Sequence, residues 1–189
     1  ALNDDILKSK SNNFLAAIHF NNTKKKKGEI GISFLDVSTG EFLISQGNID
    51  YIDKLIQNFN PSEILFSKQK RKLFEEMFGT HHHIFHLEDW VFQSDYAEEV
   101  LNKQFNTTSL KGFGVELLSS GIIAAGSALH YLSETKNDKL QHISKISRIA
   151  ENEYVWMDRF TIGNLELYHT SSQNAVTLLD VIDKTISPM

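Results

Sequence analysis

The sequence predicts an α/β domain followed by a mostly helical unit, and two patterns carry this prediction. Between about residues 10 and 108, three strand-like segments precede an alternation of helical and strand-like segments. After Gly112 and Gly114, apolar residues recur mainly at helical spacing. We therefore expect an α/β domain at residues 1–110 and the beginning of a second, mostly helical domain at residues 111–189.

The first three elements are predicted to be antiparallel strands. Residues 13–20 are nearly all apolar, which is typical of a short strand covered on both faces. Alternating side chains predict two further strands, at residues 30–35 and around residues 42–44. The Ser-Thr-Gly segment at residues 38–40 predicts a tight turn that joins these two strands as a hairpin.

Helices and strands then alternate along the chain. Apolar residues at helical spacing predict a helix at residues 49–59. The Asn-Pro pair at residues 60–61 ends this helix, because proline excludes the preceding residue from the α region. Short strands are predicted at residues 63–66 and 84–87, with a second helix around residues 73–77 between them.

A third helix is predicted to begin at Asp95, because Asp95 and Glu98 have the spacing of a capping box. Three antiparallel strands followed by helix, strand, helix, strand and helix is the element order of a ribonuclease-H-like domain. This order by itself is also compatible with several other folds that contain a mixed sheet.

A long helix opens the second unit. Three small residues, Gly121, Ala124 and Ala128, lie beside its apolar stripe and predict close packing against another backbone. A strand-like segment around residues 143–149 follows, and Asp158 is placed as a helix N-cap. The stripe itself comprises Val115, Leu118, Ile122, Ala125, Leu129 and Leu132.

Composition limits the function classes. The 189 residues include no cysteine, so neither a disulfide framework nor a thiolate zinc site is expected. The apolar runs are too short to span a bilayer and no signal segment opens the chain, so we expect a cytoplasmic protein with no membrane partner. A formal charge of −5 argues against a dedicated nucleic-acid binder, and any DNA contact should be local.

Two clusters of titratable side chains are candidate binding sites. The run Lys24, Lys25, Lys26 and Lys27 lies between two predicted strands and is a candidate contact for DNA phosphates, although such runs are more often only solvated. His81, His82, His83 and His86 have spacing that suits zinc or nickel. They lack the second cluster of a closed site, so we interpret them as a solvent-facing rim and predict no metal.

A metal-dependent nuclease is the alternative function for a ribonuclease-H-like domain. Such nucleases hold two metal ions with clustered carboxylates, one of them at the centre of the first strand. The segment at residues 14–20 carries no acid. Asp36 lies next to the predicted turn, where its carboxylate is expected to bond the backbone of Ser38 and Thr39. The sequence therefore predicts no catalytic residue.

Two blocks of sequence resemble the MutS family of DNA mismatch-recognition ATPases. The block Tyr-Val-Trp-Met-Asp-Arg-Phe-Thr-Ile-Gly-Asn-Leu-Glu-Leu at residues 154–167 resembles the entry into that family's core domain. Leu-Lys-Gly-Phe-Gly-Val-Glu at residues 110–116, followed by the small-residue helix at residues 121–131, resembles the passage from connector to core. Gly163 is a departure, since the family commonly has arginine or another helix former there. The resemblance implies a ribonuclease-H-like connector domain.

The resemblance also implies a role within a longer protein. That protein would bind mismatched DNA and hydrolyse ATP with magnesium, whereas this sequence contains no Gly-x-x-x-x-Gly-Lys-Ser/Thr loop and hence no cofactor site is expected in it. The connector would link the mismatch-reading and ATPase parts and offer a surface to the MutL partner. The candidate MutL-binding residues are Asp95, Glu98, Glu99 and Gln104. Because partner segments come from later in such a protein, the apolar stripes after Val115 are expected to be only partly covered. The second unit should therefore either fold back onto the connector or self-associate.

Overall fold

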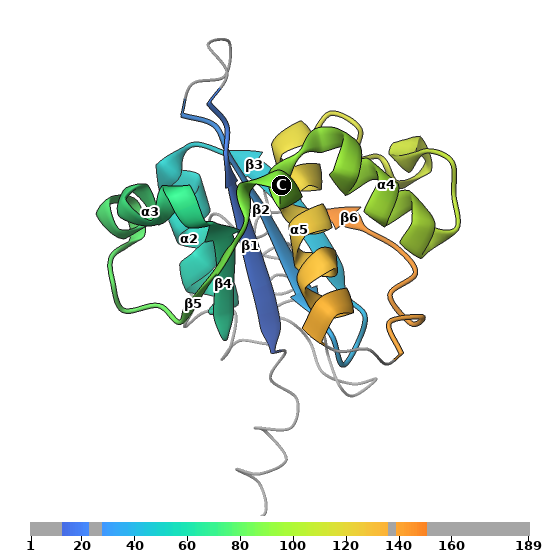
Figure 1. The fold of residues 1–189 in the computed structure, drawn as a ribbon, viewed down its shortest axis with the longest axis horizontal. Coiled ribbons are helices and arrows are strands. Elements are labelled where there is room, and N and C mark those ends of the chain that lie inside the picture. The colour runs from blue at the N-terminus through green and yellow to red at the C-terminus, as the bar shows by residue number, and fades with distance from the viewer. Residues whose placement is uncertain (1–12, 23–27, 136–138, 151–189) are drawn as a thin grey trace, which may run out of the picture. The chain divides into compact units, whose positions relative to one another are not determined.

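The computed structural model describes residues 13–22, 28–135 and 139–150 (Figure 1). The chain divides into two compact units, residues 1–150 and 151–189, and all described residues belong to the first. The predictions for Asp158 and for the block at residues 154–167 lie outside the described residues.

A six-stranded mixed sheet forms the centre of the first unit, with the strand order β5-β4-β1-β2-β3-β6. The pairs β1–β2 and β2–β3 are antiparallel, whereas β1–β4, β4–β5 and β3–β6 are parallel. In the register at the centre of the sheet, Ala17 lies opposite Ser33 on one side and Leu65 on the other. The strands are β1 Phe14–Phe20, β2 Ile30–Asp36, β3 Phe42–Gly47, β4 Glu63–Ser67, β5 Ile84–Leu87 and β6 Ser147–Arg148.

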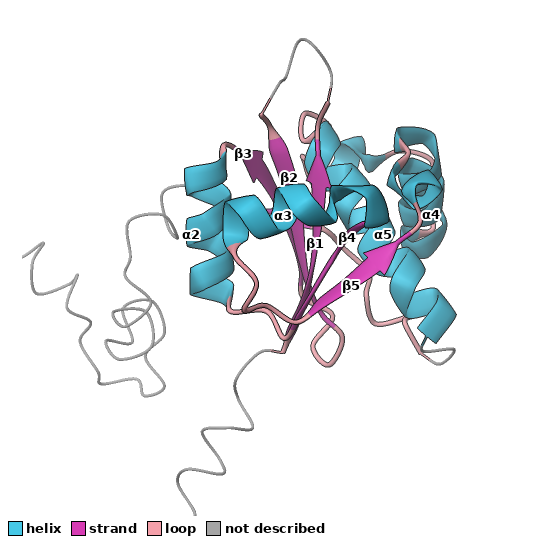
Figure 2. Ribbon diagram, turned by 60° about the vertical axis from the view of Figure 1, so that its left-hand side comes forward, coloured by secondary structure: helices cyan, strands magenta, loops and turns pink. Residues whose placement is uncertain are grey.

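Helices cover both faces of this sheet (Figures 1 and 2). Helices α2 and α3 lie on one face, α5 lies on the other, and α4 packs against α5. Short 3-10 turns η1, η2 and η3 connect the elements. Their bounds are α2 Ile49–Phe59, η1 Lys68–Lys70, α3 Arg71–Phe78, η2 Asp89–Phe92, α4 Ser94–Phe105, η3 Leu110–Phe113 and α5 Ser119–Thr135.

The predicted strands and most helix limits are confirmed. Every residue of β2 is buried, including those at alternate positions, because helices cover both faces of the sheet. Asn60 ends α2 in the left-handed conformation, with φ of 44°, immediately before Pro61. The capping box at Asp95 was a wrong prediction: α4 begins at Ser94, its N-cap is Gln93, and no side chain caps it. Asp95 instead lies in the first turn, where a carboxylate favours the helix dipole.

The predicted domain boundary between residues 110 and 111 differs from the observed division. Helix α5 packs across β1, β2 and β3, and its residues Ile122, Leu129 and Leu132 are at most 5% exposed. The apolar stripe therefore folds back onto the α/β unit, which was one of the two outcomes expected for it. Residues 111–150 belong with the sheet because its second face would otherwise be open to water. The assignment of residues 151–189 to a core domain stays a prediction.

Small residues allow α5 to approach the sheet closely, as the sequence predicts. A methyl group added to Gly31 of β2 would lie 2.0 Å from the carbonyl oxygen of Ser120. A methyl group added to Gly121 would lie 3.0 Å from the carbonyl oxygen of Ser45. The Tyr131 hydroxyl donates to Glu63 Oε2 at 3.1 Å and joins the other end of α5 to β4. None of the helices in the described part of the chain is both long and apolar enough to cross a bilayer.

Candidate interaction surface

Helix α4, which carries the candidate partner residues, is held against α5 by small side chains. Ala97 and Leu101 are fully buried in this contact. A methyl group added to Gly126 of α5 would lie 2.5 Å from Cβ of Ala97, so the two helices meet at their closest approach there. The exposed side of α4 is consequently presented by two closely packed helices, of which α5 lies on the sheet.

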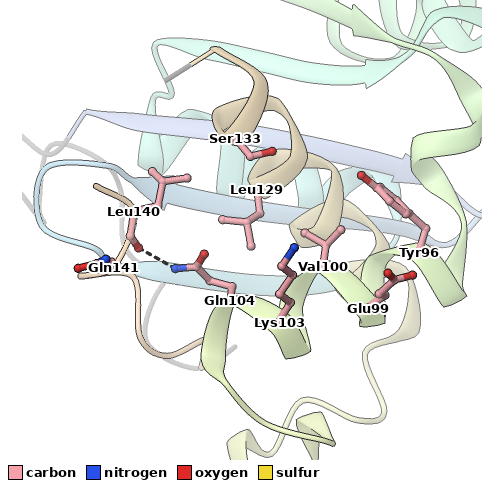
Figure 3. A pocket seen from close by; sticks show the side chains of 9 residues that line it. All are labelled: Tyr96, Glu99, Val100, Lys103, Gln104, Leu129, Ser133, Leu140 and Gln141. Atoms are coloured by element: carbon pink, nitrogen blue, oxygen red, sulfur yellow. Dashed lines mark hydrogen bonds between the residues drawn. The ribbon is translucent and has the colours of Figure 1, made fainter. Parts of the chain in front are cut away.

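A shallow groove of about 560 Å³ runs beside α4 (Figure 3). Val100, Leu129 and Leu140 supply apolar side chains from α4, from α5 and from the segment after α5. The remaining lining side chains are polar, and they comprise Tyr96, Glu99, Lys103, Gln104, Ser133 and Gln141. An apolar floor with a polar rim is the usual composition of a protein interaction surface.

Gln104 closes one end of the groove. Its side-chain amide donates to the carbonyl oxygen of Leu140 at 2.6 Å and to that of Ile143 at 2.9 Å (Figure 3 draws the first bond). The two bonds hold residues 140–143 against α4, and Ile143 is fully buried beside them. Gln104 therefore positions the wall of the groove and has its amide hydrogens engaged within the chain.

The four predicted partner residues are distributed unequally. Glu99 and Gln104 line the groove, whereas Asp95 and Glu98 are exposed on α4 outside its lining. The sequence did not indicate that Val100, Leu129 and Leu140 would line a common groove, because their apolar character is equally typical of core positions. Their shared surface depends on how α4, α5 and the segment around Leu140 pack together.

An aromatic cluster adjoins the groove at Tyr96. The Tyr96 hydroxyl and His130 Nδ1 are 2.7 Å apart, and the Trp90 ring packs edge-to-face against both rings at centroid distances of 5.1 and 5.3 Å. Trp90 is nevertheless 55% exposed. Partial burial, followed by the negative charges of Glu134 and Glu99, raises the pKa of Tyr96 above its ordinary value.

The carboxylate predicted to shape the turn has that role. Asp36 Oδ1 accepts from the backbone N–H of Ser38 at 2.8 Å and of Thr39 at 3.3 Å, and from the Ser38 hydroxyl at 2.6 Å. Burial raises the pKa of Asp36, but these hydrogen bonds outweigh it and the net shift is downward. Among the described residues, no group of three or more His, Cys, Asp or Glu side chains is arranged to hold a metal ion.

The two other candidate clusters have different outcomes. The rings of His81 and His82 lie 4.0 Å apart, and burial together with the neighbouring His81 lowers the pKa of His82. His81 and His83 are exposed, in agreement with a solvent-facing rim. The run Lys24 to Lys27 lies outside the described residues.

Comparison with known proteins places this unit in a family. A family model described as MutS domain II matches residues 13–144. The chain is 65% identical over its full length to the DNA mismatch repair protein MutS of Christiangramia forsetii and 64% identical to that of Flavobacterium psychrophilum, covering 21% of each protein. It is 50% identical to the MutS of Cytophaga hutchinsonii, again over the full chain and 22% of that protein.

The chain thus spans about a fifth of the length of the curated relatives it matches. The matched segment begins just before β1 and ends after α5, so it contains strands β1 to β5 and the α4–α5 pair described above, while β6 lies just beyond it. The chain belongs to the MutS family of DNA mismatch repair proteins, and its α/β unit is the family's domain II.

Proposed function

We propose that this chain is the connector segment of a DNA mismatch repair protein, with no catalytic activity of its own. The observation that carries the proposal is the match to MutS domain II across residues 13–144, together with 65% identity to a MutS protein along the whole chain. In the longer protein the segment would link the mismatch-reading and ATPase parts. ATP and magnesium would bind elsewhere, since this sequence contains no P-loop.

We further propose that the unit is ribonuclease-H-like. Three antiparallel strands, β1 to β3, are followed by β4 and β5, which lie parallel to β1 on its other side. This arrangement supports the element order expected of that fold. The absence of an acidic residue from β1 and the use of Asp36 in a turn both argue against nuclease chemistry.

The architecture suits a part that transmits movement. The chain enters the unit through β1, at the centre of the sheet, and the described part leaves it after β6, at the sheet's edge. Close packing of α5 on β2 and of α4 on α5 makes these elements move together. A displacement at one flank of the unit would therefore reach the other flank and the α4 groove.

We propose that MutL docks on the α4 groove and on Trp90 beside it. Asp95, Glu98 and Glu99 would contribute charge at this surface, while Gln104 would keep the wall of the groove in place by holding residues 140–143. Exposed aromatic residues are common anchors of protein interfaces. Mismatched DNA would be reached through other parts of the longer protein, with Lys24 to Lys27 as a local phosphate contact, and the protein would act in the cytoplasm.

The docking proposal can be tested with this chain and MutL from the same organism. Binding would be measured by biolayer interferometry for Glu99→Arg and Trp90→Ala, both of which change exposed side chains. We expect each variant to weaken binding about tenfold, the scale of one interface contact. Glu76→Arg, an equal charge change on the exposed side of α3, should bind as the unchanged chain does.

Circular dichroism of the variants controls for folding. MutL binding that is equally weakened by Glu76→Arg would indicate a response to net charge alone. Full binding by both Glu99→Arg and Trp90→Ala would place the MutL surface elsewhere. Incubation of the chain with labelled nucleic acid and magnesium or manganese tests the nuclease alternative, for which turnover lost in Asp36→Asn would contradict the non-catalytic assignment.

A further inference from the structure

Positive charge is concentrated in the segment that follows β4. Four of the five residues at positions 68–72, which follow β4, are basic: Lys68, Lys70, Arg71 and Lys72. With the run at Lys24–Lys27, they account for eight of the chain's 19 lysine and arginine residues. A chain with a net charge of −5 therefore has a strongly cationic region within it.

The topology brings the basic run at residues 68–72 to the end of β1. Strands β1 and β4 are parallel neighbours, so the segments that follow them leave from the same end of the sheet. Asn22, two residues after β1, and Lys70, which follows β4, line one cleft. The crevice at the carboxyl ends of parallel strands, where connections diverge to opposite sides, is the usual ligand position in open α/β sheets. Here β1 connects toward β2, and β4 connects toward β5 on the other side.

The cleft has a volume of about 180 Å³ and several hydrogen-bond donors. Asn22, Gln69, Lys70 and Gln93 contribute amide or ammonium groups to its lining. Asp89 also lines the cleft, where the Ser67 hydroxyl donates to its Oδ1 and holds this carboxylate in place. Four side chains that can donate, against one carboxylate, suit an anion.

The distribution of charge identifies the side chains that an anion would meet. Arg71 Nε pairs with Glu75 at 2.9 Å, which offsets its charge. Lys68 and Lys72 are exposed, and Lys70 is half-buried at the cleft. His19 forms part of the cleft wall, and burial, then the charge of Lys70, lowers its pKa to about 4 against an opposing effect of Glu29. His19 is thus neutral at pH 7, and Lys70 supplies the positive charge inside the cleft.

We propose that this cleft and its three lysines bind the phosphate backbone of a nucleic acid. One phosphate lies at Lys70 in the cleft, and neighbouring phosphates meet Lys68 and Lys72 on either side. The three lysines extend along the surface beyond the cleft, so they match a chain of phosphates better than a single small anion. The site consists of described residues alone and does not require the Lys24–Lys27 contact proposed above.

The test measures binding of a fluorescent DNA duplex of about 20 base pairs by anisotropy over a range of salt concentrations. The triple variant Lys68→Gln, Lys70→Gln and Lys72→Gln should bind at least about tenfold more weakly at low salt. Its slope of log affinity against log salt should fall in magnitude by about 3, because each phosphate contact contributes nearly one. The matched control changes Lys54, Lys111 and Lys145 to Gln, which removes the same charge from other exposed positions and should leave binding unchanged.

A second measurement reports on the cleft itself. Nuclear magnetic resonance titration of His19 should show its pKa rising when duplex is bound, because a phosphate beside Lys70 offsets the charge that disfavours protonation. Inorganic phosphate and ATP serve as small-anion probes and should compete only weakly with the duplex.

Several outcomes would overturn the proposal. The unchanged chain would fail to bind duplex at low salt, or the two triple variants would lose the same amount of affinity. Equally, the pKa of His19 would not change on addition of duplex, or inorganic phosphate or ATP would bind as tightly as duplex. MutL binding by the Lys68, Lys70 and Lys72 variant is measured in parallel, so that failure of the docking proposal is recorded separately.

Discussion

Gly31 shows how one residue determines a contact between layers. It lies on β2 directly beneath the start of α5, where the Ser120 carbonyl oxygen occupies the space that a side chain would need. The interfering atom belongs to backbone, so it cannot move away by a change of rotamer. The absence of a side chain at Gly31 therefore permits the observed distance between helix and sheet.

We predict that Gly31→Ala lowers the free energy of unfolding by about 3 kcal/mol or more, because the added methyl group pushes α5 off the sheet. Gly112→Ala is the matched control, since a methyl group there meets nothing within 4 Å. Urea denaturation of both variants measures the difference. Equal stability of the two variants would mean that α5 adjusts to the added group without cost.

His19 makes a second prediction at the residue scale. Its pKa falls from 6.5 to about 4 on folding, so the unfolded chain binds the proton more readily between these values. The contribution of His19 to the free energy of unfolding is therefore fully present above pH 6.5 and is lost as the pH falls toward 4, by up to about 3 kcal/mol. His19→Gln should show a shallower loss of stability over this range in chemical denaturation. Identical pH profiles would mean that His19 protonates equally in both states.

At the scale of elements, α5 obtains its N-terminal cap from a distant strand. Gln46 Oε1, on β3, accepts from the backbone N–H of Ser120 at 3.0 Å and from that of Gly121 at 3.4 Å. The first N–H groups of a helix have no partner within it, so a side chain from elsewhere stabilises them. The same bonds fix the position of α5 along the sheet.

We expect Gln46→Ala to reduce the free energy of unfolding by about 1 kcal/mol, the usual cost of a lost N-cap. Amide exchange at Ser120 and Gly121 should quicken more than exchange at the middle of α5. Gln57→Ala, which removes an exposed bond to Asp53 on α2, is the control and should change stability little. Unaltered exchange at the start of α5 in Gln46→Ala would contradict this account of the cap.

At the scale of the whole molecule, the position of α5 decides where the folded unit ends. Ile122, Leu129 and Leu132 are buried against the sheet, and each such side chain stabilises the fold by about 1.5–3 kcal/mol. Removing these side chains and exposing the strands beneath them would cost a free energy comparable to the whole stability of a domain, which is about 5–15 kcal/mol. A fragment of residues 13–150 should therefore unfold cooperatively on heating, whereas a fragment of residues 13–110 should not. Cooperative unfolding of the shorter fragment, followed by circular dichroism, would restore the boundary near residue 110.

Local sequence patterns predicted most of the helices and strands of the unit, but little of the arrangement of its surface residues. The strands at 14–20, 30–36 and 84–87, and the turn held by Asp36, follow from neighbouring residues and were correctly predicted. The capping box at Asp95 failed because spacing indicates where a cap can form, while the backbone at Gln93 decides where the helix begins. Gln104 was selected as a partner residue, but its amide binds residues 140 and 143, which are distant in sequence.

The sequence by itself determined the order of the elements and the family, because both depend on residues close together along the chain. The basic run at residues 68–72 was not singled out from the sequence, because its position beside the end of β1 depends on the parallel pairing of β1 and β4. Only the tertiary structure decided that α5 belongs to the sheet, that α4 and residues 140–143 form one groove, and that a cleft lies beside Lys70. Periodicity shows that one face of an element is buried, whereas the partner that buries it is set by contacts between residues far apart in sequence.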